Sequence, residues 1–251
     1  MTVPLTVVIP TFNEAAQIAD CVRGVSWAQE IIVADAGSGD GTADQARAAG
    51  ATVLTGSWTT IAAQRNAAIA VARHDWILAV DADERVSSEL ARAVTVAVAK
   101  APPRHQAYAA RRRNVYLGRT IRFGGWGSDW VVRLFPRDRR FVERRVHEHL
   151  ERQTDVGRLS GYLEHVPYRD LSHHLAKLDR YATWAARDLA DRGRRARLTD
   201  LLVRPPVRFF RMYVFQLGIL DGWHGAVLCV MAAASVFLKY ARLWELQRAD
   251  A

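Results

Sequence analysis

Short apolar runs alternate with helical segments in the first hundred residues, and this alternation limits the folds that the chain can adopt. The runs cover residues 5–9, 30–34, 51–54 and 76–80. Helical spacing follows at residues 15–25 and 61–72, and a further helix is expected from Thr42. Strands that alternate with helices form βαβ units. We therefore expect an α/β chain with a mostly parallel sheet, helices on both faces, and a ligand site at the carboxyl ends of the strands.

Polar loops follow the first two runs. Residues 10–14 read Pro-Thr-Phe-Asn-Glu, in which Asn13 is expected to cap the next helix. Residues 35–42 read Asp-Ala-Gly-Ser-Gly-Asp-Gly-Thr, and their glycines allow tight turns and close approach of a ligand to the backbone. A helix start can also offer N–H groups to an anion. A Gly-rich turn taken alone is more often only a turn.

A pair of aspartates follows the fourth run. Asp81 and Asp83 are one residue apart, and residues at this spacing on an extended strand point to opposite faces. We therefore expect the strand to open into a loop here, so that both carboxylates serve one ligand. Such oxygen donors suit Mg²⁺ or Mn²⁺, with diphosphate oxygens and waters as the remaining ligands.

The motifs at residues 10–14, 35–42, 65–66 and 81–83 occur in an order that resembles the nucleotide-sugar-binding half of the inverting family-2 glycosyltransferases, which have a GT-A fold. Later stretches are similar to the bacterial lipopolysaccharide-core glucosyltransferases within that family, so the resemblance covers nearly the whole chain. These stretches are residues 124–135, 146–148, 215–222 and 239–244.

The resemblance implies a role for each motif. Asp83 is expected to bind the metal, and Asp81 to share it or to hold the ribose of the nucleotide. Asp35 is expected to accept a hydrogen bond from the nucleotide base. The remaining residues expected at the nucleotide or its diphosphate are Pro10, Thr11, Glu14 and Arg65.

The general base is expected just before an Arg-Leu-Phe element. Asp129 has this position, and an inverting displacement needs a base opposite the leaving group. Glu148 is the alternative base, and His147 is a candidate third metal ligand or diphosphate donor. The lipopolysaccharide group usually has an aromatic residue and a proline where this chain has Gly127 and Ser128, so the acceptor pocket is expected to differ in shape. The other histidines receive no role.

Charge is distributed unevenly along the chain. Residues 1–100 hold 7 Lys and Arg against 11 Asp and Glu, whereas residues 101–251 hold 28 against 15. A basic half suits an anionic partner such as nucleic acid, anionic lipid or a phosphorylated glycan. No nucleic-acid-binding module accompanies it, so nucleic acid is not expected. We predict a nucleotide-sugar half at 1–100, an acceptor-binding, catalytic half at 101–170, and a helical appendage at 171–251.

The C-terminal third has features of a membrane-surface segment. Helical spacing covers residues 171–189, with a stop at Gly193. Arg204, Arg208 and Arg211 lie on one face of a further helix, among aromatic residues. Residues 225–238 are uncharged and largely apolar, but they are shorter than the roughly 20 residues that span a bilayer. We favour a helical hairpin on or in the inner leaflet over a helix buried in protein.

The expected location is the cytoplasmic face of the inner membrane. The N-terminus lacks a secretory pattern, and Cys21 and Cys229 lie in apolar helical surroundings, which favours a reducing compartment. The expected activity is transfer of a hexose, in particular glucose from a UDP-sugar, to the heptose region of the lipopolysaccharide core. The alternatives are a transferase acting on a polyprenyl phosphate and, from another class, a non-catalytic protein that binds nucleic acid or anionic lipid.

Overall fold

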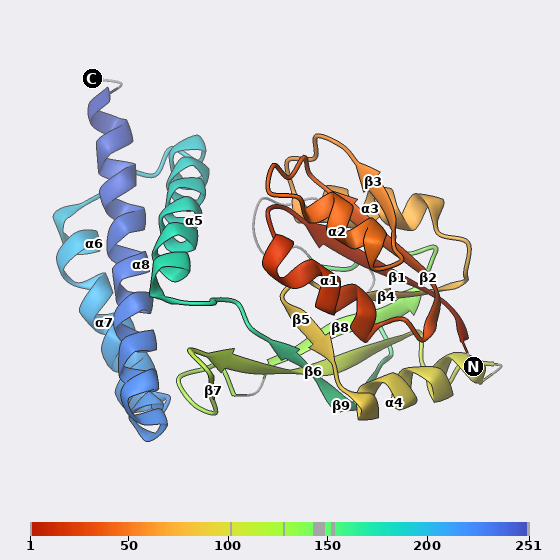
Figure 1. Cartoon of the computed structure of the whole chain (residues 1–251). Helices are drawn as coiled ribbons and strands as arrows, with labels where there is room; N and C mark the ends of the chain where they lie inside the picture. Colours follow the sequence, from red (N-terminus) through yellow and green to blue (C-terminus); the bar gives the residue numbers. More distant parts are fainter. Residues whose placement is uncertain (1, 101, 128, 143–148, 152–153, 250–251) are drawn as a thin grey trace. The chain divides into compact units, whose positions relative to one another are not determined.

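A computed structural model describes residues 2–100, 102–127, 129–142, 149–151 and 154–249 of the chain. The chain divides into two compact units, whose elements are labelled in Figure 1. The first, the sheet unit, comprises Met1–Arg112 and Asp129–His165. The second, the helical unit, comprises Arg113–Ser128 and Val166–Ala251. The functional division at residues 100 and 170 stays a prediction.

The parallel part of the sheet has the expected alternation of strands and helices. Its strands are β1 (Val3–Thr11), β2 (Ala28–Asp35), β3 (Thr52–Thr55) and β4 (Trp76–Ala79), in the order β3-β2-β1-β4. The helices between them are α1 (Ala15–Gly24), α2 (Thr42–Ala48) and α3 (Ile61–Val71). Thr11 is the register partner of Asp35, so the loops after β1 and β2 start side by side. The α/β class is confirmed.

Antiparallel strands extend the sheet beyond β4. Among the described residues, β4 is followed in the sheet by β8 (Asp129–Pro136), β6 (Ala107–Tyr116), β9 (Val156–His165) and β5 (Glu84–Val86). β8 runs antiparallel to both β4 and β6, and β5 runs antiparallel to β9. Helix α4 (Ser88–Ala99) begins at Ser87, whose hydroxyl accepts the N–H of Leu90, and it packs on β9.

The central strands face two hydrophobic clusters, one on each side of the sheet. Val7 and Ile9 of β1 pack with residues of α1, α2 and α4, whereas Val8 packs with residues of α3. Successive side chains of a strand point to opposite faces. Because both faces are covered by helices, β1 at residues 7–9 and β2 at residues 31–34 are apolar at consecutive positions rather than at every second residue.

The helical unit is built on two long helices. These are α5 (Leu171–Asp191) and α8 (Gly222–Ala249), and between them lie α6 (Leu198–Leu202), α7 (Arg204–Phe210), the π-helix η1 (Arg211–Phe215) and the 3₁₀ helix η2 (Gly218–Asp221). The expected helix from residue 171 and its stop are confirmed, since Gly193 has a φ of 69° that glycine adopts readily. α8 packs against α5 and α7, and Tyr240 and Leu243 are buried beside Ala186 of α5.

A buried carboxylate fixes the turn before α8. Asp221 is 3% exposed and accepts the N–H of Phe123 at 2.9 Å and that of Arg122 at 3.2 Å. The two-residue strand β7 (Arg119–Thr120) pairs with the end of β6 just before this contact. The segment 113–127 therefore folds with the helical unit, although its first four residues form the end of β6.

Candidate functional site

The loops after β1 and β2 are tied together by side chains. Asp35 is almost fully buried and accepts hydrogen bonds from the N–H of Ser38, at 3.0 Å, and from its hydroxyl. The N–H of Asn13 donates to Ser38 Oγ at 2.8 Å, and Asn13 Oδ1 accepts the N–H of Gly39 at 3.0 Å. The expected capping of α1 by Asn13 is wrong. Its φ of 56° and its bond to Gly39 direct the amide away from α1.

Side chains from the second loop occupy the first N–H groups of α1. Thr42 Oγ1 accepts the N–H of Glu14 at 2.9 Å, and Asp40 Oδ2 accepts the N–H of Ala15 at 3.1 Å. Burial opposes ionisation of Asp40, but its hydrogen bonds from Thr42 and Ala15 lower its pKa. The first N–H groups of a helix have no partner within the helix. At α1 the N–H groups of Glu14 and Ala15 are already hydrogen-bonded to these side chains.

The end of β1 carries a buried hydroxyl that is available to a ligand. Thr11 is 3% exposed, and within the described ranges its Oγ1 has no hydrogen-bond partner. A buried hydroxyl without a partner is costly, so this position suits a polar group of a bound molecule. Buried Gln64 of α3 donates to the carbonyls of Thr11 at 2.9 Å and Ala34 at 3.3 Å. Gln64 thereby holds the ends of β1 and β2 together.

Six charged side chains alternate in sign and form an ionic network. Its members, in order, are Arg65, Asp81, Arg133, Glu84, Arg112 and Asp129. Nη2 of Arg65 donates to one oxygen of Asp81, and Nη2 of Arg133 donates to the other at 2.6 Å. The same Nη2 of Arg133 donates to Glu84 Oε1 at 2.7 Å. Both oxygens of Asp81 are therefore engaged by guanidinium groups.

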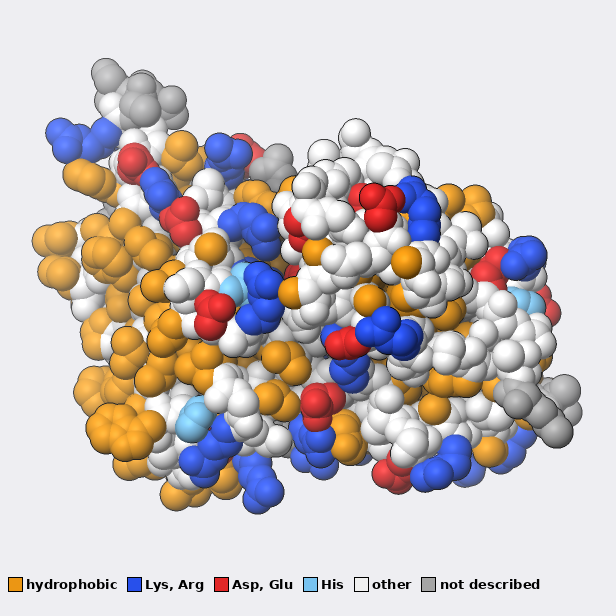
Figure 2. All heavy atoms as spheres, in the orientation of Figure 1, with side chains coloured by type: hydrophobic (Ala, Val, Ile, Leu, Met, Phe, Trp, Pro, Cys, Tyr) orange, Lys and Arg blue, Asp and Glu red, His pale blue; other side chains and the backbone are white. Residues whose placement is uncertain are grey.

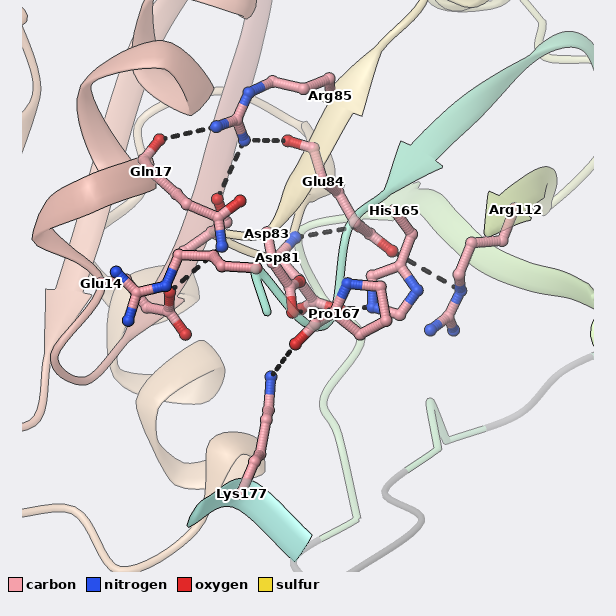
Figure 3. A network of polar contacts seen from close by, with 12 residues as sticks. Glu14, Gln17, Asp81, Asp83, Glu84, Arg85, Arg112, His165, Pro167 and Lys177 are labelled. Carbon is pink, nitrogen blue, oxygen red and sulfur yellow. Dashed lines mark hydrogen bonds and ion pairs between the residues drawn. The ribbon is translucent and has the colours of Figure 1, made fainter. Parts of the chain in front are cut away.

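The network continues through Arg112 to Asp129. Nε of Arg112 lies 3.6 Å from Glu84 Oε1 and 3.2 Å from Asp129 Oδ2, and Figure 3 shows Glu84 directed at Arg112. Arg112 and Asp129 are register partners on β6 and β8. The side chain of Glu84 is fully buried, whereas that of Asp129 is 42% exposed. One end of the network is therefore open to solvent.

The arginines keep Asp81 ionised. Burial opposes its negative charge, but the positive charges of Arg133, Arg65 and Arg112 hold the pKa of Asp81 well below its usual range. Burial likewise opposes the charge of Arg133, and the carboxylates of Asp81 and Glu84 raise the pKa of this guanidinium. Asp81 and Arg133 therefore stay charged throughout the physiological pH range.

Asp83 lies close to His165. Asp83 Oδ2 is 3.6 Å from His165 Nε2, and both residues are drawn in Figure 3. The β5–β9 register pairs Glu84 with His165, which explains how a residue from far along the chain reaches this aspartate. A carboxylate and an imidazole are suitable ligands for Mn²⁺. No cluster of three or more possible metal ligands occurs among the described residues. A cation at Asp83 would therefore take further oxygen ligands from substrate and water.

Not every residue expected at the site is described. Pro10 and Thr11 are the last two residues of β1, Asp35 is the last residue of β2, and Asp81 and Asp83 follow β4. His147 and Glu148 lie outside the described residues. No role was predicted from the sequence for Arg133, Glu84, Arg112 or His165. Arg133 did carry a usable signal, because an arginine inside a run of apolar strand residues must find a buried partner.

Replacing Arg133 should destabilise the sheet unit. Arg133→Met leaves the buried carboxylate of Glu84 and the partly buried carboxylate of Asp81 without their shared cation, so we expect the free energy of unfolding to fall by about 3 kcal/mol. Urea unfolding followed by circular dichroism measures the change. Arg23→Met removes an arginine from an exposed pair with Asp20 and should cost under about 1 kcal/mol. Equal losses in the two variants would contradict the buried role of Arg133.

Among solved structures, part of the chain is similar to a glucosyl-3-phosphoglycerate synthase from Mycobacterium tuberculosis in complex with Mn²⁺, UDP-glucose and phosphoglyceric acid. The TM-score is 0.38 at 22% sequence identity, covering 43% of each chain. A mannosyl-3-phosphoglycerate synthase from Rubrobacter xylanophilus has a TM-score of 0.38 at 24% identity, covering 44% of this chain and 41% of the other.

Sequence comparisons reach the whole chain. The lipopolysaccharide core biosynthesis glycosyltransferase LpsC of Rhizobium meliloti (strain 1021) is 26% identical over 253 residues, covering 95% of this chain and 93% of its own. An uncharacterized glycosyltransferase of Rickettsia bellii (strain RML369-C) is 26% identical, with 98% and 88% covered. The family model described as "Glycosyl transferase family 2" matches residues 6–159, more than half of the chain. As the four motifs implied, the chain belongs to glycosyl transferase family 2.

Proposed function

We propose that this glycosyltransferase moves a hexose, namely glucose from UDP-glucose, onto the heptose region of the lipopolysaccharide inner core by an inverting, metal-dependent displacement. The ionic network is the observation that carries the proposal. It joins Asp81, from the aspartate pair expected at the donor, to Asp129, the candidate base, through three intervening charged side chains. When the donor and acceptor sites are neighbours in this way, the acceptor hydroxyl can displace the diphosphate from the sugar directly.

The nucleotide is proposed to bind at the ends of β1, β2 and β4. Asp35 would accept a hydrogen bond from the base through an oxygen it now shares with Ser38, and the unpartnered hydroxyl of Thr11 would take a polar group of the nucleotide. Pro10 and Glu14 line the same loop. Asp81 would orient the ribose, and Arg65 would stabilise the diphosphate while remaining paired with Asp81.

Asp83 is the proposed metal ligand, with His165 as a further donor supported by their 3.6 Å separation. His147 remains a proposed ligand from the sequence. Mg²⁺ or Mn²⁺ would neutralise the charge of the leaving diphosphate. In this proposal Asp81 is a weaker candidate metal ligand than Asp83, because both of its carboxylate oxygens already accept hydrogen bonds from arginines.

Asp129 is the proposed general base, since its carboxylate is the exposed end of the ionic network. Arg112 would hold this carboxylate in a fixed orientation while leaving one oxygen for the acceptor hydroxyl. General-base removal of that proton assists attack on the sugar. Glu148 remains the alternative base.

The acceptor proposal depends on the full-length similarity to LpsC, whose name assigns it to lipopolysaccharide core biosynthesis. The basic C-terminal half suits a phosphorylated, lipid-anchored glycan at the cytoplasmic face of the inner membrane. The division into a nucleotide half, an acceptor-binding half and a membrane-associated appendage belongs to the same proposal. A polyprenyl phosphate is the alternative acceptor.

A donor screen tests the proposal. In the presence of Mn²⁺, UDP-glucose at about 100 times its dissociation constant should stabilise the folded protein by about 2.7 kcal/mol, because the ligand binds only the folded state. Differential scanning fluorimetry measures this as a rise in Tm, and GDP-mannose is the control donor. Transfer of labelled glucose to heptose-terminated core, and not to polyprenyl phosphate, completes the test. A rise with GDP-mannose alone would contradict the assigned donor.

A further inference from the structure

The helical unit exposes large apolar side chains from several consecutive elements. Its apolar face is defined here by Leu202, Val207, Phe210, Phe215, Leu220 and Trp223, each more than half exposed. Phe215 is 81% exposed and Trp223 is 85% exposed. Figure 2 shows hydrophobic side chains gathered over the helical unit. Soluble proteins seldom leave so many large apolar side chains together in water, so this face is expected to have a partner.

The charges around the apolar face point to an anionic partner. Residues 201–244 contain a single acidic residue, Asp221, which is buried and accepts backbone N–H groups. Arg208 and Arg211 are exposed within the same segment, and neither has an acidic partner among the described side chains. Arg204 differs, because its Nε pairs with Asp200 and its charge is compensated. Of the three arginines expected to face lipid, two therefore remain available.

Length and composition alone would allow the C-terminal helix to cross a membrane. Among the described residues, the helical segment Gly218–Arg248 meets that criterion, and 28% of its most apolar window is buried. Its apolar core is only residues 225–238, which at 1.5 Å per residue extends about 21 Å against about 30 Å of hydrocarbon. Lys239, Arg242 and Glu245 follow at once. A crossing of about 20 residues that contains this core would take at least one charged residue, Asp221 or Lys239, into the bilayer.

The packing of α8 against α5 also opposes a crossing. Nη2 of Arg242 pairs with Asp179 of α5 at 2.9 Å, and Tyr240 and Leu243 are buried beside α5. α5 itself carries many charged residues along its length. Each charge taken to the bilayer centre costs about 2.5–3.5 kcal/mol, and α8 could not enter alone without losing this packing. The two helices are therefore better suited to remain outside the hydrocarbon together.

We propose that the helical unit docks on an anionic bilayer through the apolar face, without α8 crossing it. Phe215 and Trp223 enter the acyl region of one leaflet, and Arg208 and Arg211 contact lipid phosphates. The inference deepens the proposed membrane location and rests on the proposed function only for the identity of the lipid-anchored acceptor. Apolar insertion resists salt, whereas the arginine contacts are screened by it, so binding should have both components.

Vesicle flotation tests the docking. The intact protein should float with phosphatidylethanolamine–phosphatidylglycerol vesicles, and the double variant Phe215→Ser/Trp223→Ser should bind at least about 10-fold more weakly, because two large apolar side chains lose their burial. Val96→Ser changes another apolar residue that is more than half exposed, at 56% on α4 of the sheet unit, and this variant should bind as the intact protein does. Arg208→Glu/Arg211→Glu should weaken binding and flatten its salt dependence.

A second measurement decides between docking and crossing. Arg248→Cys lies near the end of α8, whereas the native Cys21 and Cys229 are buried. On protein added to preformed vesicles, a membrane-impermeant maleimide should label this cysteine from outside, without detergent. Labelling that requires detergent would show that α8 crosses, and would overturn the inference.

Other outcomes also separate the proposals. Failure to float, or equal losses in Val96→Ser and the double aromatic variant, would reject the docking. A dimer in solution that Trp223→Ser converts to a monomer would assign the face to a second copy of the chain instead. UDP-glucose stabilisation measured on the same samples reports folding and donor binding, so loss of membrane binding with intact donor binding leaves the proposed function standing.

Discussion

Asp83→Ala is expected to lower turnover by at least roughly 10³-fold, with the fold intact. Asp83 is the proposed ligand of the cation that neutralises the leaving diphosphate, and such stabilisation is worth several kcal/mol, at about 1.4 kcal/mol for each tenfold in rate. Asp83 is only 9% exposed, and its Oδ2 lies 3.6 Å from Nε2 of His165. The variant therefore removes a carboxylate that has a fixed position. Steady-state transfer assays with and without EDTA measure the effect, and EDTA should reproduce it in the intact protein.

Asp75→Ala is the matched control for this experiment. Asp75 belongs to the same unit, its side chain is 94% exposed, and its carboxylate lies 4.0 Å from Nη2 of Arg137. Its loss should leave turnover unchanged. His165→Ala should weaken Mn²⁺ binding by about 10-fold if the imidazole is a ligand, which calorimetry measures without a turnover assay. Full activity in EDTA would remove the metal from the proposal altogether.

The parallel half of the sheet and its strand-end motifs could be predicted because both are local signals. A strand buried on both faces is a continuous apolar run, and the loop after it begins at the first polar residue. Residues 5–9 lie within β1, and residues 30–34 lie within β2. Asn13 shows the limit of local rules. A helix-capping residue was expected there, but the amide bonds Gly39 in another loop, which no pattern within residues 10–25 contains.

The ionic network could not be predicted, because it depends on strand pairing over long sequence distances. Arg133 reaches Asp81 only because β8 lies next to β4, and Arg112 reaches Asp129 only in the β6–β8 register. A shift of one residue in such a register would turn every side chain to the other face. His165 was set aside for the same reason, since it is brought to Asp83 by the β5–β9 pairing.

The second large effect on turnover is expected from replacing Asp129, the proposed general base. Asp129→Asn should lower turnover by roughly 10² to 10⁴ while UDP-glucose affinity changes little, because an amide keeps the shape of the side chain but cannot accept the proton. Asp129 contacts Arg112 at 3.2 Å and is otherwise the exposed end of the ionic network, so the substitution should also leave the buried Asp81–Arg133–Glu84 part intact. Single-turnover assays report the rate, and fluorimetry with UDP-glucose reports donor binding.

Two control variants test whether the loss of turnover is specific to Asp129. Asp138→Asn alters an aspartate that is 80% exposed shortly after β8, and it should keep full turnover. Glu148→Gln should retain most of the activity, because the proposed base is Asp129 and Glu148 is only the alternative. If Glu148→Gln loses turnover and Asp129→Asn keeps it, the base is Glu148, and the contact between Arg112 and Asp129 is then structural. If Asp129→Asn weakens donor binding as much as turnover, the network orients the nucleotide rather than the acceptor. In that case the ionic network from Asp81 through Glu84 to Asp129 belongs to the donor site alone.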